Sequence, residues 1–337
     1  MDWFEKLTGF READYDETRN KLAVNGDRLR SHVNGKSYGI GKLELVSLAD
    51  LRSRVTSHKQ ECAPTKVSIS IGDIRKIHHL PENAGAMFQV ASQFNLLEMV
   101  SYDVTPEHGV TRYQHDHTQG PACAIACGAA TIYRNYFVPV DGRPGQTATR
   151  QLDGLRAIGL ALASATGRAL NTLWEMRNGY ALCSRAGLDA ISQHLRTLGD
   201  NDLETLRGKL RIGLHHGIEV TDAPGERRPF VSQAFCSALP VAYTSVEASC
   251  WEPFARLVLE AAYEATLIAG VLNTRRTVVN TVFLTQLGGG AFGNKDEWIH
   301  TAIRRALKVV SGFGLDVKLV SYGQPSKMLL DLEREFN

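Results

Sequence analysis

The residues best suited to chemistry form a glycine-rich run near the C-terminus, between an apolar segment and an amphipathic one. The run reads Gly288-Gly289-Gly290-Ala291-Phe292-Gly293-Asn294. Where such a run joins a strand to a helix, its backbone N–H groups and the helix dipole can hold a phosphate. A sharp strand-to-helix turn is the alternative, but four glycines in six residues exceed what a turn needs. The run therefore predicts an anion-binding loop.

Two known phosphate motifs do not match this run. A P-loop needs Lys followed by Ser or Thr, whereas Lys295 is displaced and precedes Asp296, so the hydroxyl that binds Mg²⁺ is missing. The Rossmann pattern G-x-G-x-x-G can be read from the run. It lies too near the C-terminus for a dinucleotide-binding half, however, and no acidic residue ends the next strand.

Metal or thiol chemistry is the other type of site to weigh, because nitrogen, oxygen and sulfur donors gather between residues 108 and 127. These donors are His108, His115, Asp116, His117, Cys123 and Cys127. Such side chains bind zinc, and Cys123, near an expected helix start, is the candidate for a cysteine nucleophile. The spacing matches no known zinc motif, and cysteines beside Ala and Ile usually pack as small hydrophobic residues. We therefore expect no metal and no cofactor.

The elements that must position these residues follow from hydrophobic periodicity. Strands are expected at 43–46, 67–71, 87–91, 210–220, 230–241, 278–284 and 316–322, and helices at 3–10, from 47, and at 187–198, 251–272 and 296–310. Alternating aromatic residues at 133–137 favour a packed strand with an exposed Arg134, with base stacking as the alternative. Strands that alternate with helices predict an α/β fold, in which ligands bind at the carboxyl ends of strands.

The composition excludes several classes of protein. The chain has 337 residues and a formal net charge of +2, which gives no overall attraction to nucleic acid or an acidic membrane. The longest apolar stretches fall short of the roughly 20 residues that cross a bilayer, and the acidic N-terminus is unlike a secretory signal. Six irregularly spaced cysteines, at positions 62, 123, 127, 183, 236 and 250, favour reduced thiols. We therefore expect a cytoplasmic protein.

Two further segments give the glycine run a context. The strand expected at 67–71 continues into Gly72-Asp73-Ile74, and the strand expected at 87–91 is followed by Ser92-Gln93-Phe94-Asn95. Together with Gly290-Ala291-Phe292-Gly293, their order and spacing resemble the macro domain superfamily of ADP-ribose-binding proteins and ADP-ribosyl glycohydrolases. The resemblance covers parts of residues 65–98, 119–128 and 230–322.

The resemblance implies a binding site for ADP-ribose. In that site Asp73 would accept the adenine amino group, Ile74 would make a backbone contact, and Asn95 would contact the distal ribose. An Asx turn at the strand end is an equal alternative for Asp73. The phosphates would be held by two loops, with Phe292 also covering the distal ribose; the loop residues are Gly120, Ala122, Gly289, Gly290, Ala291, Phe292, Gly293 and Asn294.

The sequence departs from the family where catalysis is concerned. The glycine loop with an Asp that follows the Asn in common hydrolytic macro domains has no counterpart, since some 24 residues separate Asn95 from Gly120. The paired Glu of poly(ADP-ribose) glycohydrolases is also missing. Near Asn95, Glu98 and Asp116 are the carboxylates that could activate water and stabilise an oxocarbenium-like transition state. Solvated or capping carboxylates are the alternative for both.

We therefore predict a three-layer α/β/α fold with a mixed sheet, similar to a macro domain. Residues 1–60 would form an N-terminal extension with edge elements, and residues 61–337 the macro-domain-like part, with insertions at about 99–118 and 138–230. The expected function is binding of ADP-ribose or an ADP-ribosylated macromolecule, with hydrolysis of the glycosidic bond as its catalytic form. No membrane is expected as a partner, and nucleic acid only as a modified substrate. The alternatives are a non-catalytic interaction protein with a degenerate site, and an unrelated metal-dependent hydrolase that uses His115, His117 and Cys123.

Overall fold

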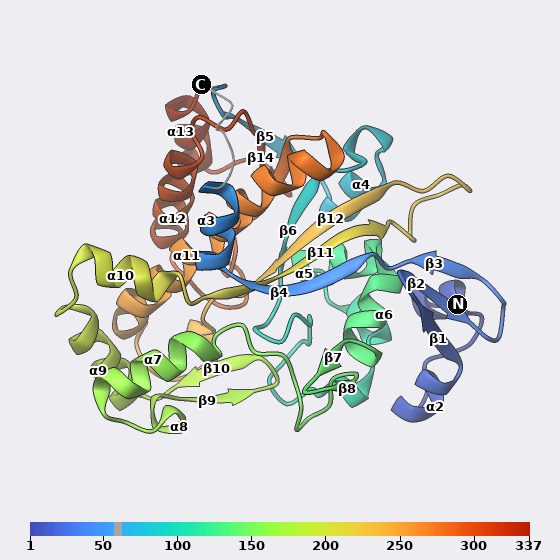
Figure 1. Ribbon diagram of the computed structural model, residues 1–337, viewed down its shortest axis with the longest axis horizontal. Helices are drawn as coiled ribbons and strands as arrows, with labels where there is room; N and C mark the ends of the chain where they lie inside the picture. The colour runs from blue at the N-terminus through green and yellow to red at the C-terminus, as the bar shows by residue number, and fades with distance from the viewer. Residues whose placement is uncertain (57–62) are drawn as a thin grey trace.

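The computed structural model describes residues 1–56 and 63–337 and centres on a seven-stranded mixed sheet (Figure 1). Across the sheet the strands are β4 (Lys42–Ser47), β11 (Arg211–Glu219), β12 (Phe230–Cys236), β6 (Met87–Ala91), β13 (Thr281–Leu284), β14 (Asp316–Ser321) and β5 (Lys66–Ile71). Strand β11 runs antiparallel to β4 and β12, whereas β12, β6, β13, β14 and β5 are parallel. The carboxyl ends of these parallel strands therefore meet at one edge. Cys62 and the expected boundary near residue 60 lie outside the described residues.

Helices cover both faces of this sheet. One face packs against α3 (Leu48–Thr56), α11 (Ala248–Thr277), α12 (Asp296–Val309) and α13 (Lys327–Glu335), and the other against α4 (Ile74–His79), α5 (Gln119–Ala126) and α6 (Gly128–Tyr136). Strand β6 shows the cause, because successive side chains of a strand point to opposite faces. Met87 belongs to the first cluster, and Phe88 and Val90 belong to the second. The predicted α/β class, with a mixed sheet between two helix layers, is confirmed.

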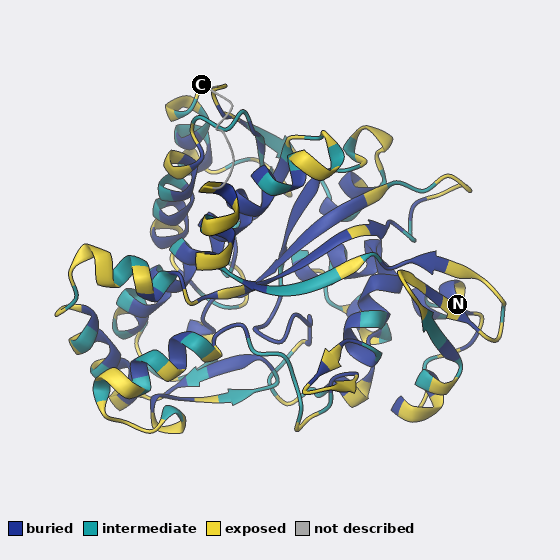
Figure 2. Ribbon diagram, in the orientation of Figure 1, coloured by how far each residue is buried: buried dark blue, intermediate teal, exposed yellow. Residues whose placement is uncertain are grey.

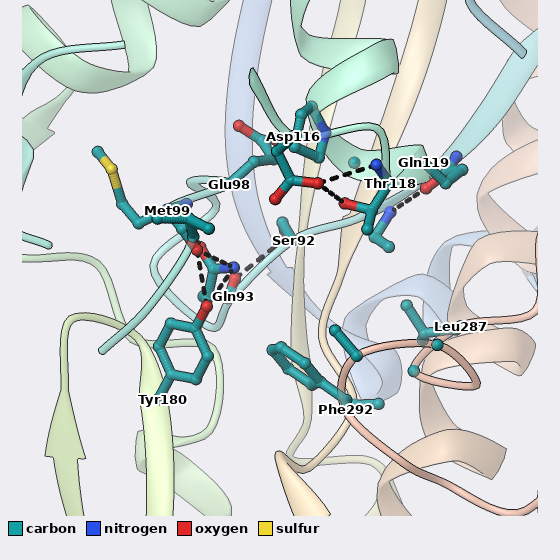
Figure 3. A pocket seen from close by; sticks show the side chains of 18 of the residues that line it. Ser92, Gln93, Glu98, Met99, Asp116, Thr118, Gln119, Tyr180, Leu287 and Phe292 are labelled. Carbon is teal, nitrogen blue, oxygen red and sulfur yellow. Dashed lines mark hydrogen bonds between the residues drawn. The ribbon is translucent and has the colours of Figure 1, made fainter. Parts of the chain in front are cut away.

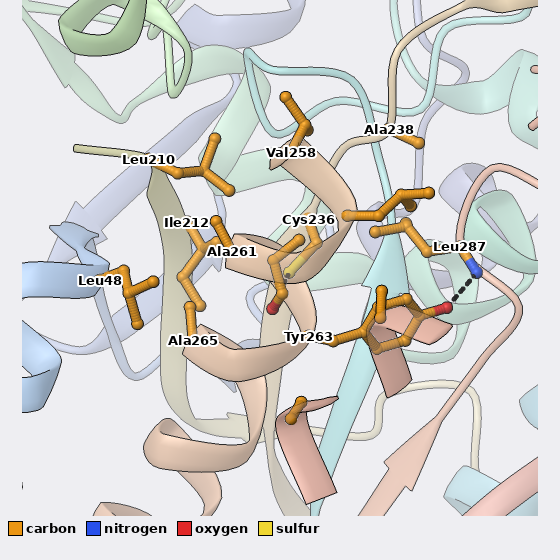
Figure 4. Packing of buried hydrophobic residues seen from close by; sticks show 14 of the residues in the cluster. Leu48, Leu210, Ile212, Cys236, Ala238, Val258, Ala261, Tyr263, Ala265 and Leu287 are labelled. Atoms are coloured by element: carbon orange, nitrogen blue, oxygen red, sulfur yellow. Dashed lines mark hydrogen bonds between the residues drawn. The ribbon is translucent and has the colours of Figure 1, made fainter. Parts of the chain in front are cut away.

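Helix α11 is the central element of the first helix layer. Most of its length is buried, and Figure 2 shows that buried residues also dominate the strands in the middle of the sheet. Small residues let it approach closely, since a Cβ atom at Gly270 would lie 2.4 Å from the side chain of Val282 in β13. The Tyr263 hydroxyl of this helix donates to the Thr285 carbonyl at 2.6 Å. It also accepts from the Leu287 N–H at 2.8 Å, the hydrogen bond drawn in Figure 4. The core therefore anchors the segment that leads into the glycine run.

Elements outside the sheet form two groups and several short 3₁₀ helices. The N-terminal group packs on α6 through its own apolar cluster and comprises α1 (Trp3–Thr8), α2 (Tyr15–Asn20), β1 (Leu22–Asn25), β2 (Arg28–Ser31) and β3 (Ser37–Gly39). The group that precedes β11 comprises β7 (Pro139–Val140), β8 (Arg143–Pro144), α7 (Arg156–Thr166), α8 (Leu170–Leu173), β9 (Trp174–Arg177), β10 (Tyr180–Cys183), α9 (Arg185–Leu195) and α10 (Asp200–Arg207). The 3₁₀ helices are η1 (Pro81–Asn83), η2 (Pro106–His108), η3 (Thr111–His115) and η4 (Val241–Tyr243).

The prediction for residues 133–137 is wrong. These residues belong mostly to the end of α6 and not to a strand, and Arg134 is fully buried and not exposed. Burial of this cation is possible because Glu98 supplies a carboxylate partner from another part of the chain. Among the helices of the described ranges, none is long and apolar enough to cross a membrane.

Candidate functional site

A cleft lies along the edge where the parallel strands end, and it consists of two adjoining pockets. The first, the Asp73 pocket, has a volume of about 500 Å³ and lies beyond the ends of β5 and β14. The second, the Glu98 pocket, has a volume of about 300 Å³ and lies between α5, the glycine run and the hairpin β9–β10 (Figure 3). The pockets share the wall residues Ala91, Asp116, Thr118, Gln119 and Gln286. Cavities of this size hold small-molecule ligands.

The glycine run forms one wall of the Glu98 pocket as a compact turn. The Gly293 N–H donates to the Gly290 carbonyl at 3.0 Å, which closes the turn. Across the described part of the chain, no hydrogen bond uses the N–H groups of Gly290, Ala291 and Phe292 as donors. These three residues line the pocket, and N–H groups that are left free in such a turn can bind an anion.

The other predicted residues of the run shape the turn and do not line the pocket. Gly293 has a φ of +71°, a left-handed conformation that favours glycine. The Asn294 side chain donates to the Leu239 carbonyl at 2.9 Å and so ties the run to the segment after β12. A Cβ atom at Gly289 would lie 3.0 Å from Ile299 of α12. The structure thus separates the predicted set into residues that face the pocket and residues that support them.

The start of helix α5 forms the opposite wall. A Cβ atom at Gly120 would lie 2.0 Å from the Ala91 carbonyl oxygen, so only glycine allows the helix to begin against the end of β6. Gln119 ties the same two elements, because its side chain accepts from the Ala91 N–H and donates to the Gln89 carbonyl, both at 2.8 Å. Gln119 and Gly120, the first residues of α5, line the Glu98 pocket, so the positive end of the helix dipole faces the cleft. Gly120 lines the Glu98 pocket and Ala122 the Asp73 pocket.

Asp73 lies at the far end of the cleft, where it caps helix α4. Its Oδ1 atom accepts from the Arg75 N–H at 2.9 Å, which is the turn interaction weighed from the sequence. The hydrogen bonds of the described residues leave Oδ2 available, and both Asp73 and Ile74 line the Asp73 pocket. Tyr322, which directly follows β14, lines the same pocket with 85% of its surface exposed. The strand expected at 316–322 included Tyr322, so the exposure of this ring beside the pocket was not expected.

Glu98 is a buried carboxyl group on the wall of the second pocket. The Arg134 guanidinium donates to the two carboxylate oxygens of Glu98 at 3.2 and 3.4 Å. The backbone N–H of Glu98 donates to the Tyr113 hydroxyl at 3.1 Å. Burial raises the pKa of Glu98 to about 7, and the nearby charge and hydrogen bonds of Arg134 offset this rise only in part. A carboxyl group with such a pKa can exchange a proton near neutral pH, as a general acid or base must.

Asp116 lines both pockets and is half-buried. Its Oδ1 atom accepts from the Thr118 N–H at 2.9 Å and from the Thr118 hydroxyl at 2.6 Å, which shapes the turn before α5 (Figure 3). This geometry matches the capping alternative, yet Asp116 also borders the space where a ligand would lie.

The expectation that Asn95 contacts a ligand is not met, since this residue is fully buried and lines neither pocket. Its side chain donates to Gln151 at 2.8 Å and accepts from the Leu97 N–H at 3.1 Å. A Cβ atom at Gly179, in the hairpin β9–β10, would lie 2.6 Å from the Asn95 side chain, so the hairpin covers it. Asn95 therefore shapes the turn that leads from β6 to Glu98.

The structure does not bring the His and Cys residues together. Cys123 and Cys127 are fully buried, and burial raises the pKa of both thiols, which disfavours a reactive thiolate. His115 and His117 are exposed. Within residues 1–56 and 63–337, no group of three or more His, Cys, Asp or Glu side chains could hold a metal ion. The hypothesis of a metal-dependent hydrolase built on His115, His117 and Cys123 therefore has no site in the structure.

These features define an α/β protein whose cleft, at the carboxyl edge of parallel strands, is lined by carboxylates in both pockets and by main-chain donors in the Glu98 pocket. No protein-family model matches the chain, and no curated protein matches it. Among solved structures, it is similar to poly(ADP-ribose) glycohydrolase from Thermomonospora curvata, with 12% identity, 94% of each chain covered and a TM-score of 0.46. It is also similar to poly(ADP-ribose) glycohydrolase from Deinococcus radiodurans in complex with ADP-ribose, with 12% identity, 87% of this chain and 92% of the other covered, and a TM-score of 0.45.

Proposed function

We propose that the cleft binds ADP-ribose, free or attached to a macromolecule, and hydrolyses the bond that attaches it. The observation that supports this most directly is the set of chemical groups that line the two adjoining pockets. A carboxylate and an exposed aromatic ring line the Asp73 pocket, and main-chain donors and a carboxyl group with a pKa near 7 line the Glu98 pocket. These groups match a base in the first pocket, and a diphosphate and a ribose with a reactive carbon in the second.

Each part of the ligand meets a matching group in this arrangement. Asp73 accepts the adenine amino group through Oδ2, and Tyr322 stacks on the base, since aromatic faces attract planar rings. The diphosphate lies between the start of α5 and the N–H groups of Gly290, Ala291 and Phe292, because both offer positive partial charge to an anion. The distal ribose then lies in the Glu98 pocket.

Hydrolysis assigns Glu98 the role of general base. Ionised Glu98 removes a proton from water, whose oxygen forms a bond to the anomeric carbon of the distal ribose. The glycosidic bond breaks, its electron pair stays on the leaving atom, and the proton passes to that atom. Asp116, at the border of the two pockets, stabilises the positive charge that develops on the sugar ring.

The test is calorimetric titration of the full chain with ADP-ribose, followed by an assay for ADP-ribose released from modified protein. Gly290→Glu should abolish binding because it places a negative charge where phosphate binds. The variant should still fold, because no atom lies within 4 Å of a Cβ atom at Gly290. Gly199→Glu is the matched control, since Gly199 has the same free space and lies at the start of α10. Glu98→Gln should bind ADP-ribose but release none. A folded wild type that does not bind ADP-ribose would refute the proposal.

A further inference from the structure

The Glu98 pocket ends in a group of aromatic rings, opposite the wall that it shares with the Asp73 pocket. Tyr180, Tyr243 and Phe292 line it, and their ring centroids are 5.1 to 5.5 Å apart. Figure 3 shows Tyr180 and Phe292 across the pocket from Asp116 and Thr118. Tyr243 and Phe292 are half-buried, so parts of their rings are accessible to a ligand. We call these three rings the aromatic end.

The charged side chains that line this pocket are both acidic. They are Glu98, which already pairs with the buried Arg134, and Asp116, and no Lys, Arg or His occurs among the lining residues, all of which the structure describes. Because aromatic faces carry negative potential, the rings add to the attraction for a cation. A neutral or anionic group at this end would gain neither interaction.

The protein already holds one guanidinium group beside the aromatic end. Tyr102 packs its ring edge-on against Tyr180 and Tyr243, with centroids 6.3 Å away in each case. The Arg177 guanidinium, from the hairpin β9–β10, lies 4.8 Å from the Tyr102 centroid and pairs with Asp103. A planar cation between an aromatic face and a carboxylate is therefore a geometry that these residues support.

We infer that the group attached to the distal ribose is a guanidinium, so that the ligand is ADP-ribosylated arginine. This inference rests on the proposed function, which places the distal ribose in the Glu98 pocket. The guanidinium stacks on the accessible ring of Tyr243 and faces the carboxylate of Asp116. On hydrolysis, water bonds to the anomeric carbon and the carbon–nitrogen bond breaks with its electron pair on nitrogen. The proton from water goes to the departing guanidine, which restores its charge.

The experiment compares three ligands by calorimetric titration of the full chain at low temperature, with the integrity of each ligand checked afterwards. The ligands are ADP-ribose, ADP-ribosyl-arginine and an ADP-ribosyl-serine peptide, whose linkage is neutral. The arginine compound should bind about five- to tenfold more tightly than ADP-ribose, the range for a partly desolvated cation on an aromatic face. Tyr243→Leu should bind the arginine compound no more tightly than ADP-ribose, whereas Tyr243→Phe, which keeps the ring, should retain the gain.

The possible results distinguish a failure of the guanidinium inference from a failure of the proposed function. If ADP-ribose binds but the arginine compound binds no more tightly, or the serine peptide binds equally well, the inference is wrong and the proposed function stands. If the gain persists in a folded Tyr243→Leu variant, the aromatic end is not its source and the inference is also wrong. If a folded wild type binds none of the three ligands, both the inference and the proposed function are wrong.

Discussion

Replacing Glu98 by Gln tests the feature on which the proposed chemistry depends, the raised pKa of a buried carboxyl group. Burial disfavours the ionised form, so folding raises the pKa from the usual 4.5 to about 7. Between these two values the folded chain keeps a proton that the unfolded chain releases, and stability falls as the pH rises. Protonated Glu98 makes its full contribution to the free energy of unfolding below pH 4.5, and this contribution is lost by about pH 7. At 1.36 kcal/mol per pH unit, the loss is ~3 kcal/mol.

The assay is urea unfolding of the wild type and Glu98→Gln across pH 4 to 8. The difference in free energy of unfolding, wild type minus variant, should fall by ~3 kcal/mol between about pH 4.5 and 7 and then stay level. Groups common to both proteins cancel in this difference. A difference that does not change with pH would refute the reasoning, because Glu98 would then ionise alike in both states.

A second variant tests the cause of the shift. The Arg134 guanidinium lowers the pKa of Glu98 against the larger effect of burial. We therefore measure the free energy of unfolding of Arg134→Gln minus that of the Arg134→Gln/Glu98→Gln double variant. This difference should continue to fall above pH 7. If hydrolysis occurs, its rate in the wild type should rise through about pH 7, because the general base must be ionised.

Three further substitutions test how the cleft is built. Gly120→Ala places a Cβ atom 2.0 Å from the Ala91 carbonyl, so urea unfolding should show a loss of roughly 1–3 kcal/mol and titration a weaker affinity for ADP-ribose. Tyr263→Phe leaves the buried Leu287 N–H without its hydroxyl acceptor, which should cost about 1–3 kcal/mol in urea unfolding; an unchanged stability would refute this role. Glu12 accepts from the N–H groups of residues 110 and 111 at 2.8 and 2.6 Å, so Glu12→Ala should speed proteolysis within residues 99–118 without unfolding the chain.

Local pattern was sufficient to predict much of the fold. The strand expected at 87–91 coincides with β6, and the helix expected at 296–310 is α12, one residue shorter. Apolar residues that alternate, or recur at helical spacing, carry this information within a few turns of chain. The small sheet β1–β3 and the hairpin β9–β10 were not expected, because their short strands contain few alternating positions.

Part of the candidate site was also predictable. Residues that follow a strand in an α/β fold gather at the carboxyl edge of the sheet, and the glycine run was chosen for that reason. Asp73 and Gly120 were chosen from the resemblance to macro domains. The structure places all of them around one cleft. The conformational freedom of glycine and the direction of a strand are properties of the local chain, so they can be inferred before the fold is known.

The α/β class and the loops that border the cleft follow from local sequence, whereas the side chains that face the cleft depend on how distant segments pack together. Asn95 follows β6 as expected, yet the hairpin that contains Gly179 covers it. Arg134 is polar in sequence but buried, because Glu98, 36 positions away, provides its charge partner. Tyr180 reaches the cleft from a segment whose role the sequence left open. The burial and the charge pairing of a side chain depend on residues that are distant in sequence, so local periodicity cannot predict them.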